Sequence, residues 1–560
     1  MDSQETVCSP ILSLEELENF KIPSWTNSIL PLQSKNNWCI STNNIQCHED
    51  IQKWKVQPRY LSNTVPRTIV CHDMKGGYLE DRFIHGSKDE SSYNFIHWMV
   101  IDTFIYFSHS FITIPPFGWI NAAHRHGVYI LGTIITEGKS GEELLNSIIN
   151  NDDKINMFVN AIVNLTECFK LDGWLLNIEN QVKNVIGLKK LVKQLTNELH
   201  HQNPRTLIIW YDSVLETGEL KWQNELNEKN SCWFDMCDGI FLNYNWKDKH
   251  LLDTYNNCGN RNLDVYVGID VFARNCLGGM DSHKSMKLIR EHGFSAAIFA
   301  PGWTHESLTN EPNDTFRKRF EVNDLKFWKS LSPYLYEHGT KNLFKTIFHS
   351  GCSKNYYNMN SLDLKMNTLR LGIDVEISNV INNIDQKQKE NNNNNNKDIN
   401  NCNCQTIVDT NMLRNGTALK ICYQKPHQIN RIVTCDVTFD NTLLVACIYQ
   451  YVQTPIKFNI LLLCQNANGR LSRTELELQS DDVANSNYMN CVLSQYEKLI
   501  LLRRIFQLHT PLDDKWILKC FKIKNRDSKI MELGVELIEA GEILIGGLAI
   551  CTYPIRGGMQ

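Results

Sequence analysis

Hydrophobic residues between about 65 and 300 occur in short β-type runs, separated by longer segments of mixed polarity. Several of these segments repeat apolar residues at helical spacing, for example Ile155, Phe158 and Ile162. The runs are Thr68–Cys71, Phe104–Phe107, Val128–Ile135, Gly173–Ile178, Leu207–Tyr211, Gly239–Leu242, Val265–Val271 and Ala296–Ala300. Eight strands that alternate with crossover segments predict an α/β fold, a parallel (β/α)₈ TIM barrel. A doubly wound open sheet is the competing fold, but the turn His72–Gly77 lacks its GxGxxG pattern.

The pattern changes after a charged, helical stretch at about 313–338. Short alternating runs follow, with few helical patterns, and they predict one or two β-sandwiches. These runs are Leu369–Ile377, Leu443–Ile448, Phe458–Leu463, Leu499–Leu502 and Ile543–Cys551. The predicted organisation is therefore an N-terminal extension (1–60) packed on the next domain, a barrel (61–340) and a β-sandwich region (341–560).

An asparagine-rich tract interrupts the predicted sandwich region at 385–405. Six asparagines follow one another at 391–396, and they leave the tract with nothing to bury. We predict a disordered insertion in a surface loop, without a functional role.

Composition and charge exclude several classes of function. The 560 residues carry a formal charge of −5, with no basic stripe that would bind nucleic acid. No apolar run approaches the roughly 18 residues that span a bilayer, and the acidic start shows no secretory signal. The 19 cysteines lack the paired C-x₂-C spacing of a zinc site and suit a reducing compartment. We expect a cytosolic monomer without metal, organic cofactor, nucleic-acid partner or membrane contact.

Chemistry in such barrels sits at the C-terminal ends of the strands, and the fourth run ends with a polar pair. Alternation along the strand predicts that Asn177 and Glu179 face the barrel interior together. Gly173 and Leu175 share this face, whereas Asp172, Trp174 and Leu176 face the helices. An amide and a carboxylic acid would then stand side by side at the barrel mouth. The alternative is a glutamate that caps the next helix.

An amide beside an acid suits one particular kind of glycosidase. Most glycosidases use two carboxylates, but some let the 2-acetamido oxygen of an N-acetylglucosamine (GlcNAc) attack its own anomeric carbon. Such an enzyme needs one acid to protonate the leaving oxygen and one polar group to hold the acetamide. Glu179 suits the first role and Asn177 the second. Tyr211, at the end of the fifth run, can donate to the acetamide oxygen.

Further motifs form an ordered series along the same region. They are Phe107–His109, Thr113–Pro116, Ala122–Val128, Leu131–Glu137, Trp210–Ser213, Trp222–Asn224, Phe241–Trp246, Val267–Arg274 and Phe299–Trp303. Together with the Asn177–Glu179 segment, this series resembles glycoside hydrolase family 85, the cytosolic endo-β-N-acetylglucosaminidases. The resemblance covers about residues 60–340. In the C-terminal region only Ile545–Leu548 is suggestive of the family's accessory sandwich.

The resemblance implies retaining, substrate-assisted hydrolysis of the β-1,4 bond in the N,N′-diacetylchitobiose core of N-glycans. Substrates would be free oligosaccharides, glycoproteins and glycopeptides, and the oxazoline intermediate would also permit transglycosylation. By the same resemblance, Glu179 is the general acid/base, Asn177 orients the acetamide and Tyr211 helps to hold it. Trp222 and Trp246 would line the acceptor and core-sugar subsites. One departure is Gly138, which stands where the family often has an aromatic residue.

Other residues at predicted strand ends are candidates for substrate binding, with structural roles as the alternative. They are His109, Glu137, Asn243, Asp270 and Trp303. His124 and His126 precede the third strand, and we expect them at the barrel bottom or on a helix end, without chemistry.

Two competing functions are weaker. A catalytically silent N-glycan-binding lectin on a barrel scaffold would have lost its acid, whereas Glu179 is present. A chitinase-type strand reads Asp-x-Asp-x-Glu, whereas this chain has Asn177 at the middle position.

Overall fold

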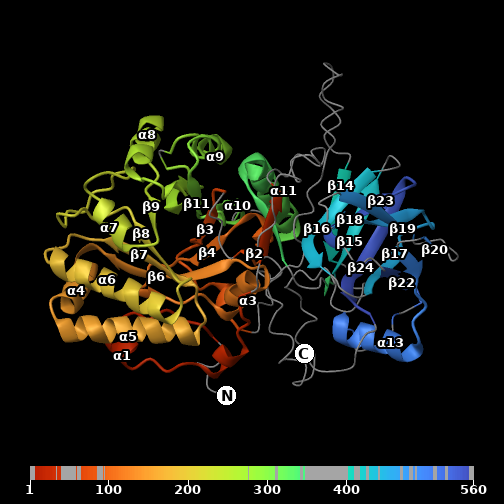
Figure 1. The fold of residues 1–560 in the computed structure, drawn as a ribbon, viewed down its shortest axis with the longest axis horizontal. Coiled ribbons are helices and arrows are strands. Elements are labelled where there is room, and N and C mark those ends of the chain that lie inside the picture. Colours follow the sequence, from red (N-terminus) through yellow and green to blue (C-terminus); the bar gives the residue numbers. More distant parts are fainter. Residues whose placement is uncertain are drawn as a thin grey trace.

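The computed structural model describes residues 7–32, 35–39, 58–59, 65–84, 92–93, 95–274, 276–308, 313–340, 345–346 and most of 402–553. Figure 1 shows a barrel surrounded by helices beside the β-sheets of the C-terminal region. Within the described part of the chain, no helix combines the length and apolar character needed to cross a membrane.

The predicted barrel is confirmed. Its parallel strands are β3 (Thr68–His72), β4 (Thr103–Tyr106), β6 (Tyr129–Glu137), β7 (Gly173–Glu179), β8 (Leu207–Tyr211), β9 (Gly239–Leu242), β10 (Val265–Asp270) and β11 (Ser295–Phe299). Strand β11 pairs with β3, and β4 pairs with β6, so the sheet closes on itself. The short strand β5 (Ile112–Thr113) pairs antiparallel with β6 and was not predicted.

Helices cover the outside of the barrel (Figure 1). They are α3 (Phe117–Arg125), α4 (Gly138–Ile149), α5 (Asp152–Cys168), α6 (Val185–Gln202), α7 (Ser231–Met236), α8 (Asp248–Asn257), α9 (Ser282–Glu291), α10 (Trp303–Glu306) and α11 (Asn313–Leu331). Helix α5 is capped by Asn151, whose side chain accepts hydrogen bonds from two backbone N–H groups of the first turn. Its apolar stripe, including Ile155 and Phe158, is buried against the barrel.

Strand β7 shows the predicted alternation of side chains. Leu175 belongs to the core inside the barrel, together with Ile209 and Phe241. Trp174 and Leu176 belong to the outer core, which the helices cover. Strand β7 starts at Gly173, where a Cβ atom would lie 1.9 Å from the backbone oxygen of Leu207, so only glycine allows β7 and β8 to approach this closely.

The start of the chain packs against the barrel. Cys8, Ile11, Leu17 (on helix α1, Leu14–Glu18), Trp25 and Ile29 all join the outer core. The Trp25 ring lies 5.5 Å from Phe117 and 5.3 Å from Phe169 between centroids. The first part of the predicted extension therefore shares the core of the barrel.

Two sheets form the C-terminal region and enclose one core. The seven-stranded sheet has the order β19-β18-β23-β16-β12-β1-β2, and the eight-stranded sheet contains β14-β15-β24-β17-β22-β21-β20, with β13 paired to β24. Their bounds are β1 Lys35–Cys39, β2 Pro58–Arg59, β12 Glu337–Thr340, β13 Lys345–Thr346, β14 Cys402–Val408, β15 Thr417–Tyr423, β16 Gln428–Thr438, β17 Leu443–Tyr451, β18 Phe458–Asn466, β19 Leu471–Glu477, β20 Ala484–Asn485, β21 Tyr488–Asn490, β22 Ile517–Ile523, β23 Ser528–Leu537 and β24 Gly541–Thr552. Side chains from both sheets pack together, as in a β-sandwich. The seven-stranded sheet takes strands from all three predicted segments of the chain.

One predicted strand of this region is wrong. Leu499–Leu502 is helical, at the junction of α13 (Gln495–Ile500) and a π-helical turn, Leu501–Ile505. The helix starts with a capping box in which Ser494 and Glu497 bind each other's backbone N–H groups. The predicted run Leu369–Ile377 and most of the asparagine-rich tract lie outside the described residues. The end of that tract, 402–405, belongs to strand β14 instead.

Candidate active site

The end of β7 brings Asn177 and Glu179 to the mouth of the barrel. In the parallel ladder between β6 and β7, Asn177 pairs with Ile135 and Glu179 pairs with Glu137. Asn177 is 3% exposed, and its Nδ2 group has no hydrogen-bond partner within the described structure. A buried donor without a partner is costly to the folded state. The Nδ2 group can only donate, so the position suits a ligand that brings an acceptor oxygen to it.

The Glu179 carboxyl group has a strongly shifted acidity. Burial raises its pKa to about 7, and the neighbouring Glu137 adds to this effect. Two groups act in the opposite direction: His109, and the Trp222 indole, which hydrogen-bonds to the carboxylate. A carboxyl group with a pKa near neutrality can both give and take a proton at physiological pH, as a general acid/base must.

His109 and Glu137 form an ion pair next to this acid. The Nδ1 atom of His109 lies 3.1 Å from each carboxylate oxygen of Glu137. The hydrogen bond with Glu137 raises the pKa of His109, and the charges of Asp73 and Glu179 act in the same direction. The structure thus places this imidazole among three carboxyl groups, all of which favour its protonated form.

Strand β8 contributes Tyr211, which is 6% exposed and faces the barrel interior. Its hydroxyl donates to Oδ1 of Asn243 at 2.9 Å and accepts a hydrogen bond from Tyr244. Burial, followed by the charge of Glu179, keeps the pKa of Tyr211 well above its ordinary value. Tyr211 therefore stays protonated, and its single hydroxyl proton is directed at Asn243.

Strand β10, the loop that follows it and the start of helix α10 provide another wall of the mouth. Asp270 is 2% exposed, and its Oδ2 atom accepts from Nε of Arg274 at 2.8 Å. The Arg274 guanidinium lies 4.8 Å from the centroid of the Phe272 ring, which in turn lies 5.0 Å from the Trp303 ring. This wall joins a charged pair to two aromatic faces, a combination that suits sugar hydroxyls and C–H faces.

The two tryptophans assigned to the acceptor and core-sugar subsites lie in different surroundings. Trp222 is 42% exposed and contacts Glu179, so it does lie at the mouth. Trp246 is 2% exposed, belongs to the outer core, and donates its indole N–H to the backbone oxygen of Gly268 at 2.7 Å. The structure therefore does not bring Trp246 to the sugar-facing side.

The two histidines before β6 lie at the other end of the barrel. His124 is buried, with Nε2 3.0 Å from Asp172 and Nδ1 2.7 Å from the backbone oxygen of Leu30. Burial lowers the pKa of His126 to about 3, so this ring stays neutral. These contacts agree with structural roles.

Sequence reasoning missed three residues of the mouth: Asp73, Tyr244 and Asn224. Asp73 directly follows β3, and this position after a strand was a usable signal. Tyr244 comes two residues after β9, where alternation no longer defines a direction. Asn224 has a left-handed backbone, φ 60°, which no local pattern of the sequence reveals.

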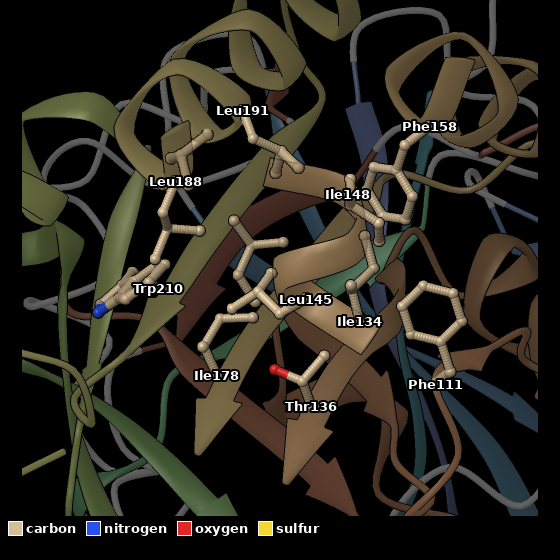
Figure 2. A pocket seen from close by; sticks show the side chains of 12 residues that line it. Phe111, Ile134, Thr136, Leu145, Ile148, Phe158, Ile178, Leu188, Leu191 and Trp210 are labelled. Carbon is tan, nitrogen blue, oxygen red and sulfur yellow. The ribbon is translucent and has the colours of Figure 1, made fainter. Parts of the chain in front are cut away.

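A small cavity lies on the outer, helix-facing side of β6 and β7, away from the barrel interior. It occupies about 20 Å³ between these strands and helices α4 to α6. Figure 2 shows its lining, in which Leu188 and Leu191 of α6 and Ile134 and Ile178 of the strands surround the same space. It is almost wholly apolar and has the size of one water molecule, so it has no part in sugar binding. No group of three or more His, Cys, Asp or Glu side chains within the described residues could hold a metal ion.

A closed (β/α)₈ barrel with an amide, a raised-pKa acid and a tyrosine at its mouth has the architecture of a glycoside hydrolase. Residues 78–356 match the model of glycosyl hydrolase family 85. The cytosolic endo-β-N-acetylglucosaminidase of Homo sapiens is 49% identical over 297 residues, which is 52% of this chain and 39% of that protein. Cytosolic endo-β-N-acetylglucosaminidase 2 of Arabidopsis thaliana is 42% identical over 267 residues, 47% of this chain and 37% of that protein. Residues 78–356 therefore belong to glycosyl hydrolase family 85.

A solved structure shows the same fold over most of the chain. The glycoside hydrolase domain of Endo-D from Streptococcus pneumoniae R6 aligns with a TM-score of 0.64 at 14% identity, covering 96% of this chain and 82% of that one. The chain spans about two fifths of the length of the curated relatives it matches.

Proposed function

We propose that the chain is an endo-β-N-acetylglucosaminidase that hydrolyses the β-1,4 bond in the N,N′-diacetylchitobiose core of N-glycans. The observation that carries this proposal is the pair formed by Asn177 and Glu179 on the inward face of β7, next to Tyr211 of β8. Membership of family 85 and the names of the relatives support the reaction class. The relatives are also named as cytosolic, and we extend this location to the chain.

The reaction begins with attack by the substrate's own acetamide. The acetamide oxygen forms a bond to C1 while the bond from C1 to the leaving O4 breaks, and Glu179 gives its proton to O4. Asn177 accepts the acetamide N–H through Oδ1. This hydrogen bond aims the acetamide oxygen at C1, which is a positioning effect. Tyr211 lies on the other side of the acetamide, and its one hydroxyl proton turns from Asn243 to the acetamide oxygen when the substrate binds. The product of this step is an oxazolinium ion, which keeps the acetamide N–H proton, and the reducing-side GlcNAc departs.

The second step reverses the first with water as the nucleophile. Glu179, now a carboxylate, takes a proton from water as the oxygen attacks C1 and the oxazoline ring opens. Two displacements at C1 leave the β configuration unchanged. If a GlcNAc hydroxyl replaces the water, the same step builds a new β-1,4 bond, and the exposed ring of Trp222 offers this acceptor an apolar platform.

The acidity of Glu179 supports both halves of this cycle. With a pKa of about 7, the carboxyl group is protonated in a large fraction of molecules near neutral pH. Once its proton has left, the carboxylate is also a competent base. An ordinary, fully solvated glutamate would be almost entirely ionised at that pH.

The decisive experiment uses a labelled high-mannose glycopeptide and mass analysis of both products. Cleavage within the chitobiose core leaves one GlcNAc on the peptide and one on the released glycan. Glu179→Gln, prepared in parallel and checked by circular dichroism, is the control for contaminating activity. An intact glycopeptide after incubation with folded wild-type protein would refute the proposal.

A further inference from the structure

The loop that follows β8 is fixed to the barrel by a buried acid. Asp212, which is 1% exposed, accepts the backbone N–H of Asn224 at 2.7 Å and that of Gln223 at 3.1 Å. Asn224 has a left-handed backbone with φ 60°. This conformation raises the free energy of residues other than glycine, and of asparagine less than of most. Strained residues of this kind are concentrated at functional sites.

The side chain of Asn224 continues this network toward the barrel mouth. Its Oδ1 atom accepts the backbone N–H of Asn245 at 2.9 Å and Nδ2 of Asn243 at 2.8 Å. A backbone N–H can only donate, so the atom that faces it must be the oxygen of the Asn224 amide. The neighbouring Asn243 must then present its NH₂ group to Asn224.

This fixed orientation determines what Asn243 offers to Tyr211. With its NH₂ group turned to Asn224, Asn243 presents its oxygen, and the Tyr211 hydroxyl donates to that oxygen at 2.9 Å. In this series of hydrogen bonds each residue donates to the next: the Tyr211 hydroxyl to Asn243, the Asn243 NH₂ group to Asn224, and the Asn224 backbone N–H to the Asp212 carboxylate. Asn224 is the link whose orientation the backbone sets.

We infer that Asn224 is a positioning residue for the reaction: through Asn243 it holds the Tyr211 hydroxyl where the substrate's acetamide group must meet it. This inference rests on the proposed function and adds a residue that touches none of the reacting atoms. A purely structural role, in which Asn224 only holds the loop through the Asn245 N–H, is the alternative. The two roles differ in whether the effect of Asn224 depends on the Tyr211 hydroxyl.

Two substitutions isolate the side-chain oxygen. Asn224→Gly keeps the left-handed backbone and its N–H bond to Asp212, but it removes Oδ1. Asn224→Asp keeps an oxygen that accepts the same two N–H groups. We expect kcat for glycopeptide hydrolysis to fall about tenfold in Asn224→Gly, the equivalent of one well-placed hydrogen bond, and to stay near wild type in Asn224→Asp.

The matched control makes the same exchange at the opposite end of the barrel. Lys170 also has a left-handed backbone, φ 51°, just before β7. Lys170→Gly should leave kcat unchanged. Unchanged kcat in Asn224→Gly, or an equal loss in Asn224→Asp, would overturn the inference.

A double-mutant cycle separates positioning from loop support. In the Tyr211→Phe background the hydroxyl is gone, so Asn224→Gly should cause no further loss of kcat. A purely structural role predicts the same fold-loss in both backgrounds, and that result would overturn the inference.

A crystal structure of Asn224→Gly provides a readout that does not depend on activity. We expect the hydrogen bond between Tyr211 and Asn243 to be lost or the Asn243 amide to be rotated. If both side chains keep their wild-type positions, the inference fails. If the wild-type chain instead releases no glycan, the proposed function fails, while the crystal structure still decides whether Asn224 holds Tyr211.

Discussion

Glu137 and Glu179 stand directly opposite each other at the ends of β6 and β7, and His109 lies 3.1 Å from each carboxylate oxygen of Glu137. Two adjacent carboxylates repel each other, so one of them is favoured in its neutral form. Burial raises the pKa of Glu179 to about 7, and the charge of Glu137 adds to this effect. Glu137 thus adds to burial in favouring the protonated form of Glu179, while His109 limits the effect.

This relationship predicts opposite shifts for two variants. Glu137 raises the pKa of Glu179, so Glu137→Gln should lower it; His109 lowers that pKa, so His109→Asn should raise it. Because cleavage needs protonated Glu179, the alkaline limb of the kcat/KM profile should move to lower pH in Glu137→Gln. It should move to higher pH in His109→Asn.

The measurement is a pH–rate profile of both variants on one glycopeptide. Circular dichroism at the extremes of the pH range should exclude unfolding. Shifts of both variants in the same direction would contradict the electrostatic interpretation and favour direct contact of these residues with substrate.

Loss of the acid itself should be far more severe. Glu179→Gln cannot protonate the leaving oxygen, and removal of a general acid costs about 10²–10⁴-fold in rate. Since a neutral amide replaces a group that burial already disfavours in its charged form, the thermal unfolding midpoint should not fall. Near-normal turnover by a purified, folded variant would remove Glu179 from its role.

The two tryptophans should separate packing from substrate contact. Trp246 is buried in the outer core, so Trp246→Ala should cost about 3–5 kcal/mol of unfolding free energy. Trp222 is 42% exposed, so Trp222→Ala should cost little stability. It should instead weaken transfer to a GlcNAc acceptor more than it slows hydrolysis. Chemical denaturation and a paired assay of transfer and hydrolysis measure both effects; equal losses of transfer and hydrolysis in Trp222→Ala would make it a packing residue.

The sequence predicted the parts of the site that depend on strand alternation. Asn177 and Glu179 follow Leu175 on one face of β7, and a two-residue period is enough to place all three. Trp222 and Trp246 look alike in the sequence, because both follow strands in loops. Only tertiary packing buries one ring and exposes the other.

Two further features depended on conformations that the sequence does not display. Leu499–Leu502 is a short apolar run, which fits a strand or a helix equally well. The Ser494–Glu497 capping box just upstream stabilises the helix start and favours the helix. The proposed role of Asn224 depends on its left-handed backbone and on hydrogen bonds to residues about 20 positions away. Contacts of this kind arise only when β8 and β9 lie side by side.

Asn177→Ala should separate the two halves of the proposed mechanism. In this proposal, Asn177 is needed while the acetamide closes the oxazoline ring, because its oxygen fixes the N–H group and sets the angle of attack. Without it the acetamide rotates freely, and we expect hydrolysis of the natural glycan to collapse. A glycan supplied as a preformed oxazoline has already passed this step, so Glu179 can act as base on an acceptor GlcNAc and build the β-1,4 bond.

Both activities should be measured on one preparation of Asn177→Ala, with folding checked by circular dichroism. The expected variant makes glycoconjugates from the oxazoline but does not hydrolyse them. Because the Asn177 amide has an unpartnered Nδ2 group in the buried mouth, its removal should not destabilise the fold, which makes a loss of activity readily interpretable. If the oxazoline is as inert as the natural glycan, Asn177 has another role and substrate assistance loses its main support. If hydrolysis survives, Asn177 does not orient the acetamide.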